Sequence, residues 1–261
     1  MDRNISFRLE ELYKRYNIRA YVHPDPLEFL YNYNELRDIE IVGLIASSLA
    51  YGRVAQILKA VEKILAIMSA SPYEYINGTA EKKIARDILP FKHRLTTGEE
   101  MRDLVLGIKK VLKQYGSLNA CFTEGLRIYG DDFMAAQTHF VESLGGKDVK
   151  SSLLPWPPRG SPCKRLNLYL RWMARSDAVD PGGWKGVSAS QLIIPLDTHM
   201  FKISRALGFT RRNQADLKTA LEITSAFKQI CPEDPVKYDF CLTRLGIRSD
   251  TDMRAFLADI R

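Results

Sequence analysis

The feature that most constrains this chain is the spacing of its apolar residues, which recur every three or four positions over most of its 261 residues. This spacing places them on one face of a helix, whereas a strand would require alternation at every second position. No alternating run is long enough for a sheet. We therefore predict an all-α fold, with helices over residues 5–16, 39–50, 54–68, 101–115, 118–129, 133–144, 164–174, 197–207, 213–230, 234–245 and 250–260, and a short helix starting at Ser71-Pro72.

One break interrupts this helical pattern. Gly145-Gly146 opens a polar stretch, and the proline-rich run 154–160 cannot be helical, because proline lacks the backbone N–H that a helix interior needs. Hydrophobic residues make up 46% of the chain, which is enough to bury a sizeable core. We expect one helical unit over residues 1–261, with two lobes that meet near residues 145–160 and a candidate catalytic segment at 151–212.

Positive charge is concentrated in the candidate catalytic segment. Residues 151–212 hold ten Lys and Arg against three Asp, and this excess of seven equals the formal net charge of the whole chain. A local basic excess favours a polyanionic partner such as nucleic acid. It also fits a solvated face on a helical protein that binds other proteins, so charge alone leaves that function open.

The four cysteines do not form a Cys-x-x-Cys pair, which argues against zinc ribbons and clustered iron–sulfur ligation. We predict no metal and no cofactor. No apolar run has the length of a membrane span or a signal peptide. We therefore expect a cytoplasmic, nucleoid-associated monomer with no membrane partner.

Two residues in the basic segment could perform chemistry at a sugar carbon. Lys164 follows the turn Gly160-Ser161-Pro162, so it lies near a helix start, where the helix dipole and Arg165 disfavour its charged form. A neutral amine is a nucleophile. Asp197 is a predicted helix cap, and its carboxylate could stabilise a developing positive charge. Taken singly, these residues also fit a surface lysine and a plain helix cap.

The motifs around these residues resemble two families. Leu154-Pro155 through Gly160 to Lys164, a helix, and then Ile194-Pro195-Leu196-Asp197-Thr198-His199 resemble the core of the helix-hairpin-helix DNA glycosylases. Nearly the whole chain more closely resembles the family called domain of unknown function 2400, through the segments Leu49-Ala50-Tyr51-Gly52-Arg53-Val54, Phe91-Lys92-His93-Arg94, Cys163-Lys164-Arg165-Leu166-Asn167-Leu168 and Pro232-Glu233-Asp234-Pro235.

The glycosylase resemblance implies a two-lobed fold with a central cleft and an activity. The expected activity is that of a bifunctional glycosylase/lyase, which removes a damaged, oxidised base from duplex DNA as archaeal oxoguanine glycosylases do. Lys164 would attack the sugar C1′ to form a Schiff base, and Asp197 would stabilise charge and assist proton transfer.

The same resemblance implies roles for the residues around this pair. The loop of Tyr51, Gly52 and Arg53 would contact DNA near the lesion. The hairpin and its basic neighbours would hold backbone phosphate; these are Arg159, Gly160, Ser161, Arg165 and Arg171. The candidates for the base pocket are Trp156, Trp184 and His199.

Other functions stay open beside this one. The hairpin is longer and richer in proline than is usual for these glycosylases. A non-catalytic DNA-binding helix-hairpin-helix protein would retain the phosphate site without using Lys164 as a nucleophile. An enzyme acting on RNA would prefer structured RNA to duplex DNA at matched salt.

Overall fold

The computed structural model describes residues 3–145, 153–247 and 256, and this part of the chain is all-α, as the spacing predicts. Its only extended pairing in the described ranges is an isolated bridge between His93 and Thr96. The α-helices are α1 (Arg3–Tyr16), α2 (Leu36–Ser48), α3 (Val54–Ile67), α4 (Pro72–Gly78), α5 (Glu81–Ile88), α6 (Gly98–Tyr115), α7 (Leu118–Ile128), α8 (Phe133–Ser143), α9 (Lys164–Ala174), α10 (Thr198–Ala206), α11 (Leu217–Lys228) and α12 (Asp239–Ile247). The 3₁₀ helices are η1 (Arg19–Tyr21), η2 (Pro26–Asn32), η3 (Pro157–Arg159) and η4 (Ala189–Gln191).

Helices α2 and α6 each begin three residues earlier than predicted, at Leu36 and Gly98, and three differences from the predicted helices are larger. Helix α11 begins later than expected because Asp216 caps it, accepting the Thr219 N–H at 2.9 Å. Helix α12 begins at Asp239, after a series of turns that contains Pro235. The sequence analysis missed α5. The expected helix at 250–260, apart from residue 256, and much of the expected lobe boundary lie outside the described residues.

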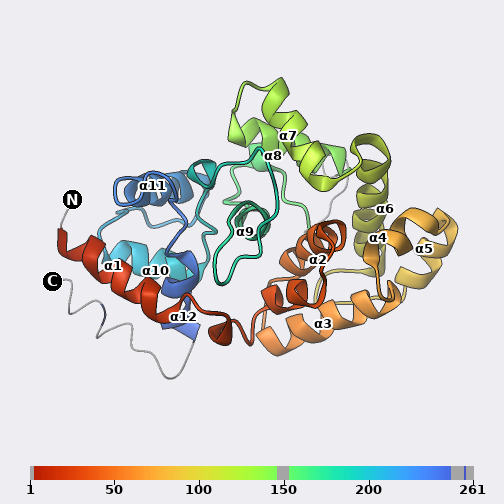
Figure 1. The fold of residues 1–261 in the computed structure, drawn as a ribbon, viewed down its shortest axis with the longest axis horizontal. Helices are drawn as coiled ribbons and strands as arrows, with labels where there is room; N and C mark the ends of the chain where they lie inside the picture. Colours follow the sequence, from red (N-terminus) through yellow and green to blue (C-terminus); the bar gives the residue numbers. More distant parts are fainter. Residues whose placement is uncertain (1–2, 146–152, 248–255, 257–261) are drawn as a thin grey trace.

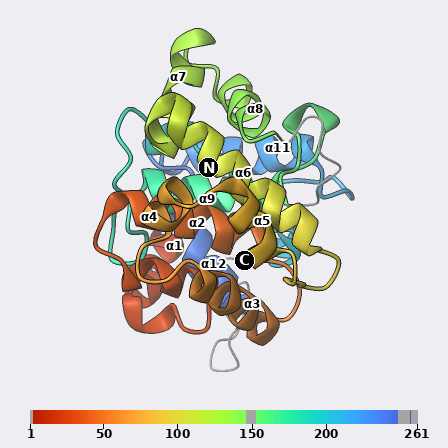
Figure 2. The same ribbon diagram turned by 90° about the vertical axis from the view of Figure 1, so that its right-hand side faces the viewer.

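Helix α9 lies at the centre of the molecule, with other helices around it (Figure 1). Helices α2 to α6 lie on one side of α9, and α1, α10, α11 and α12 lie on the other. The view in Figure 2 shows α7 and α8 above α9. Helix α1, from the start of the chain, contacts α12, from near its end. The central helix therefore contributes its first turn to the junction of these two groups.

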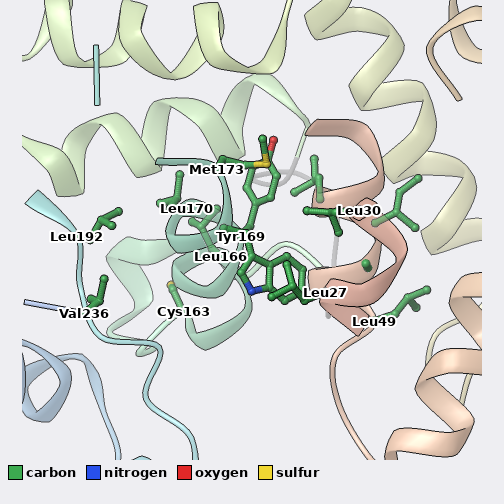
Figure 3. Close-up of a cluster of buried hydrophobic side chains, with 14 of the residues drawn as sticks. Leu27, Leu30, Leu49, Cys163, Leu166, Tyr169, Leu170, Met173, Leu192 and Val236 are labelled. Atoms are coloured by element: carbon green, nitrogen blue, oxygen red, sulfur yellow. The ribbon is translucent and has the colours of Figure 1, made fainter. Parts of the chain in front are cut away.

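The packing of α9 against α2 requires a small residue (Figure 3). A Cβ atom on Gly43 of α2 would lie 3.2 Å from Tyr169 Cε2 and 3.3 Å from Met173 Sδ, both on α9. Those distances are tighter than most contacts in a packed core. Tyr169 and Trp172 are fully buried. The close approach of the two helices fixes where α9 begins relative to the end of α2.

Buried ion pairs hold α9 to the segments that follow it. Arg171 donates to Asp180 at 3.1 Å and to Asp239 of α12, and its side chain is only 4% exposed. Arg175 pairs with Asp180 and, at 2.9 Å, with Asp234. A buried charge is tolerated when it is paired in this way. The expected phosphate contact of Arg171 is therefore wrong, because its guanidinium is buried and paired inside the protein.

A buried carboxylate organises a second junction. Glu40 of α2 accepts the N–H groups of Leu118 and Asn119 at 3.0 and 3.1 Å, and these are unpaired donors of the first turn of α7. It also accepts the indole N–H of Trp184 at 3.1 Å. Burial raises the pKa of Glu40, and these hydrogen bonds oppose the shift.

In the part of the chain that the structure describes, no helix combines the length and the apolar character that spanning a membrane requires.

We expect Glu40→Gln to lower the free energy of unfolding by about 2 kcal/mol. The three N–H donors share both carboxylate oxygens of Glu40, whereas an amide supplies only one acceptor oxygen. Urea unfolding followed by circular dichroism measures this change. Glu62→Gln, on the exposed face of α3, is the matched control and should change stability little. Equal effects of the two substitutions would contradict the role assigned to Glu40.

Candidate functional site

A cavity of about 750 Å³ opens where the first turns of α9 and α10 meet. Segments from both sides of α9 contribute to its wall. The lining residues are Pro24, Asp25, Pro26, Ala50, Tyr51, Gly52, Val54, Ile57, Lys164, Leu168, Leu196, Asp197, Thr198, His199, Ala215, Arg244 and Gly246. The two residues that the sequence singles out for chemistry, Lys164 and Asp197, thus lie in one cavity wall.

The turn before α9 determines where Lys164 is placed. Gly160 has φ of 77° and ends η3 in the left-handed region that glycine tolerates. Ser161 Oγ accepts the Cys163 N–H at 3.2 Å. Cys163 then has φ of 46°, unusual for a residue with a side chain, and is buried. Lys164 is the first residue of α9.

The amine of Lys164 lies in a largely desolvated place. It donates to the Ala50 carbonyl, two residues beyond the end of α2, at 3.2 Å. Burial lowers the pKa of Lys164, and Arg165 acts in the same direction. The carboxylates of Asp197, Asp25 and Asp239 oppose this shift. A larger fraction of the amine is therefore neutral near pH 7 than in an exposed lysine.

Asp197 caps α10. Its backbone is extended, and its Oδ1 accepts the Met200 N–H at 2.8 Å. This hydrogen bond fixes the carboxylate at the start of α10. The carboxylate raises the pKa of Lys164, so the two charges interact across the cavity. This arrangement can stabilise a cation that forms between the two residues.

His199 lies in the same wall, as expected for a base-pocket candidate. A Cβ atom on Gly246 of α12 would lie 2.3 Å from His199 Nδ1, so the imidazole packs directly on this glycine. Any larger residue at position 246 would displace the ring. The described residues contain no cluster of three or more His, Cys, Asp or Glu that could hold a metal ion.

The other two base-pocket candidates lie outside the cavity wall. Trp184 is 6% exposed, its indole donates to Glu40, and its ring packs against Phe122 and Tyr169. A base cannot stack on a ring enclosed in this way, so the prediction for Trp184 is wrong. Trp156 is half-buried, donates to Glu142 at 3.1 Å and does not line the cavity.

The loop 49–53 forms one rim of the cavity, with Tyr51 and Gly52 in the wall and Arg53 exposed beside them. The Tyr51 hydroxyl lies 2.9 Å from the His93 carbonyl and 2.6 Å from Thr96 Oγ1, and it accepts the Thr96 N–H. The turn 93–96 therefore braces this loop. Sequence reasoning noted the Lys92-His93-Arg94 motif but missed this function for it.

The basic candidates near the hairpin differ in their surroundings. Arg165 donates to the Ser48 carbonyl at 2.8 Å, and its guanidinium lies over the Tyr51 ring, 5.1 Å from the centroid. Arg159 and Gly160 are exposed, and the Gly160 carbonyl accepts the Leu217 N–H at 3.1 Å. Ser161 is half-buried in the turn. Arg159 and Gly160 can reach a ligand outside the protein, whereas Arg165 supports the rim.

A second cavity of about 760 Å³ lies over the starts of α2, α4 and α7. Its two buried carboxylates have structural partners. Asp38 accepts the Ser71 hydroxyl at 2.9 Å and the Tyr73 N–H at 2.8 Å, and Glu40 caps α7. Lys164 and Asp197, the two residues predicted to perform chemistry, line the first cavity, which is therefore the candidate site.

Sequence reasoning missed Asp25 and Arg244, which also line the candidate site. The Pro-Asp-Pro run at 24–26 indicates a cap, but nothing in the sequence relates it to a residue 219 positions away.

Comparison with known proteins places the chain in a family. No curated protein and no solved structure gives a significant match. A family model described as "Protein of unknown function (DUF2400)" matches residues 25–248, which include every residue of the cavity wall except Pro24. The chain therefore belongs to the DUF2400 family.

Proposed function

We propose that this protein is a DNA glycosylase/lyase that removes a damaged base from duplex DNA by forming a Schiff base on Lys164. The observation that carries the proposal is the convergence of Lys164 and Asp197 in one cavity, at the starts of two helices. A nucleophilic amine and a fixed carboxylate on either side of a reacting carbon are what cleavage of a glycosidic bond by an amine requires.

The lowered pKa of Lys164 supports its role as the nucleophile. The neutral amine forms a bond to the sugar C1′ while the bond from C1′ to the base breaks, and the base leaves with the electron pair and takes up a proton. The amine then gives up one proton, O4′ leaves C1′ and is protonated, and a protonated Schiff base remains. Asp197 stabilises the positive charge that builds at C1′ during these steps.

The cavity and its rim support a flipped nucleotide as the substrate. Its volume, about 750 Å³, lies in the range of sites that enclose a small ligand. A base inside a duplex must leave the stack before an enzyme can reach its sugar in this way. The exposed cation Arg53 lies between Gly52 and Val54 of the cavity wall, and a second exposed cation, Arg159, precedes α9 by five residues. Such cations can bind the phosphates on either side of an extruded nucleotide.

One observation favours a second function, that of a non-catalytic DNA-binding protein. Lys164 and Arg165 donate to the carbonyls of Ala50 and Ser48, at the end of α2. Cations in this position stabilise the end of a helix, which is a structural role. In that case Lys164 would hold the rim loop in place and form no bond to DNA.

Borohydride trapping separates the two functions. We expect the wild-type protein to form a covalent adduct with a duplex that carries one oxidised base, and Lys164→Gln to form none. Asp197→Asn keeps an N-cap and should slow trapping by about 10² to 10³, the usual loss on removing one electrostatic stabiliser. Gel electrophoresis of the trapped complex measures both effects.

Lys202→Gln is the control for the loss of a positive charge, because Lys202 is exposed on α10 and does not line the cavity. It should retain trapping. Salt-dependent duplex binding without any adduct, weakened only modestly by Lys164→Gln, would establish the non-catalytic function instead. A preference for structured RNA at matched salt would favour an enzyme acting on RNA.

The pH dependence of trapping at a preformed abasic site tests the state of the amine. Because burial lowers the pKa of Lys164, we expect the rate to rise with pH and to reach half its maximum below pH 10.5, the ordinary value for lysine. Asp197 raises this pKa, so Asp197→Asn should move the midpoint to lower pH. A midpoint near 10.5 in both proteins would identify an exposed lysine as the source of the adduct.

A further inference from the structure

Asp25 and Arg244 form an ion pair in the wall of the cavity that Lys164 and Asp197 also line. The two residues come from opposite ends of the chain. Arg244 Nη2 lies 2.7 Å from Asp25 Oδ2. The reaction proposed above assigns neither residue a role. Both residues line the same cavity as Lys164 and Asp197, so a base bound in the cavity can contact them.

The Asp25 carboxylate retains capacity to bind a ligand. Its Oδ1 accepts the Leu27 N–H at 3.0 Å and caps η2, while Oδ2 accepts from Arg244. Two carboxylate oxygens offer about four acceptor positions in all, so further acceptor positions exist. The side chain is 20% exposed and lines the cavity. An ionised carboxylate only accepts hydrogen bonds, so what it can bind is an N–H or O–H donor.

Arg244 fixes the orientation of this carboxylate. Its side chain is 4% exposed, and its guanidinium lies over the Phe240 ring, 4.6 Å from the centroid. The planar guanidinium offers donors in a rigid fork, next to the acceptor of Asp25. The cavity wall therefore presents an acceptor of fixed orientation, the Asp25 carboxylate.

On the basis of the function proposed above, we propose that Asp25 selects flipped bases that present a ring N–H beside a carbonyl. Arg244 orients the Asp25 carboxylate that accepts this N–H. Uracil, hypoxanthine and guanine-derived lesions have this lactam edge. Adenine and cytosine have an acceptor at the same ring nitrogen and donate only through an exocyclic amine. The ring N–H of a lactam is the more acidic donor, and it makes the stronger bond to an anion.

Matched pairs of bases test this selection without requiring any chemistry. Uracil differs from cytosine, and hypoxanthine from adenine, in the lactam edge alone. Each base is carried by a 2′-fluoro nucleotide, which resists excision, at one position of the same duplex. An abasic-site analogue lies opposite this position, so that none of the four bases is paired. Fluorescence anisotropy then gives the affinity for each duplex. We expect the wild-type protein to bind uracil and hypoxanthine at least about 10-fold more tightly than cytosine and adenine, the lower end for one strong hydrogen bond.

Asp25→Asn is the decisive variant, because asparagine is as good a helix cap as aspartate but replaces an anionic oxygen with a donor. Both ratios should fall to near unity. Asp132→Asn is the matched control: Asp132 caps α8, accepting the Met134 and Ala135 N–H groups at 3.0 Å, and does not line the cavity. It should leave both ratios unchanged.

The outcomes separate this proposal from the proposed reaction. A wild-type protein with no preference within either pair, or a preference that persists in Asp25→Asn, overturns the selection by Asp25. Borohydride trapping at an abasic site involves no base and should be retained in Asp25→Asn, with its pH midpoint moved to lower pH because Asp25 raises the pKa of Lys164. A loss of trapping equal to the loss of binding would make Asp25 a purely structural residue and would also overturn the proposal. Absence of trapping in the wild-type protein, with selective binding retained, would overturn the reaction alone.

Discussion

The buried ion pairs of Arg171 and Arg175 are the interaction on which the rest of the structure depends. They join α9 to the segment that contains Asp180 and to Asp239, the first residue of α12. Burial raises the pKa of Asp239 to about 6, even with Arg171 beside it. A buried arginine that lost such partners would destabilise the fold strongly. Because α12 is held this way, its Arg244 and Gly246 reach the cavity.

A second constraint acts at the other end of α9. The carbonyls at the end of α2 accept hydrogen bonds from Lys164 and Arg165, while Gly43 lets α2 approach α9 closely. The same contacts that stabilise the helix end also keep the Lys164 amine away from solvent. The capping of α2 and the burial of the Lys164 amine are therefore two consequences of one geometry.

Much of the fold follows from local patterns in the sequence. Helix α9 has the predicted limits, since its apolar stripe is regular and the proline-rich run before it forms no α-helix. The prediction that this run cannot be helical was too strict, because Pro157–Arg159 form the 3₁₀ helix η3, and proline is tolerated in the first turn of a helix. Helix α12 was predicted to start too early, because its start is set by a series of turns that periodicity does not describe. The burial of Arg171 was also missed: a basic residue in a basic segment suggests a surface, and two of its three acidic neighbours, Asp25 and Asp239, come from distant positions.

For the candidate site, the sequence indicated Lys164, Asp197 and His199, because all three lie at or next to a predicted helix start. It did not indicate Asp25 and Arg244, because only the tertiary fold brings these two residues together in the cavity wall. Trp184 was misread for the opposite reason: an aromatic residue in a glycine-rich loop suggests an exposed ring, yet Glu40 and Phe122 enclose it.

The pairing of Asp25 with Arg244 links residues 219 positions apart, so the cavity is completed only when both ends of the matched segment have come together. A chain still emerging from the ribosome lacks α12 and with it part of the wall. The lowered pKa of Lys164 is therefore a property of the folded molecule, because it arises from burial among segments that only the complete fold brings together.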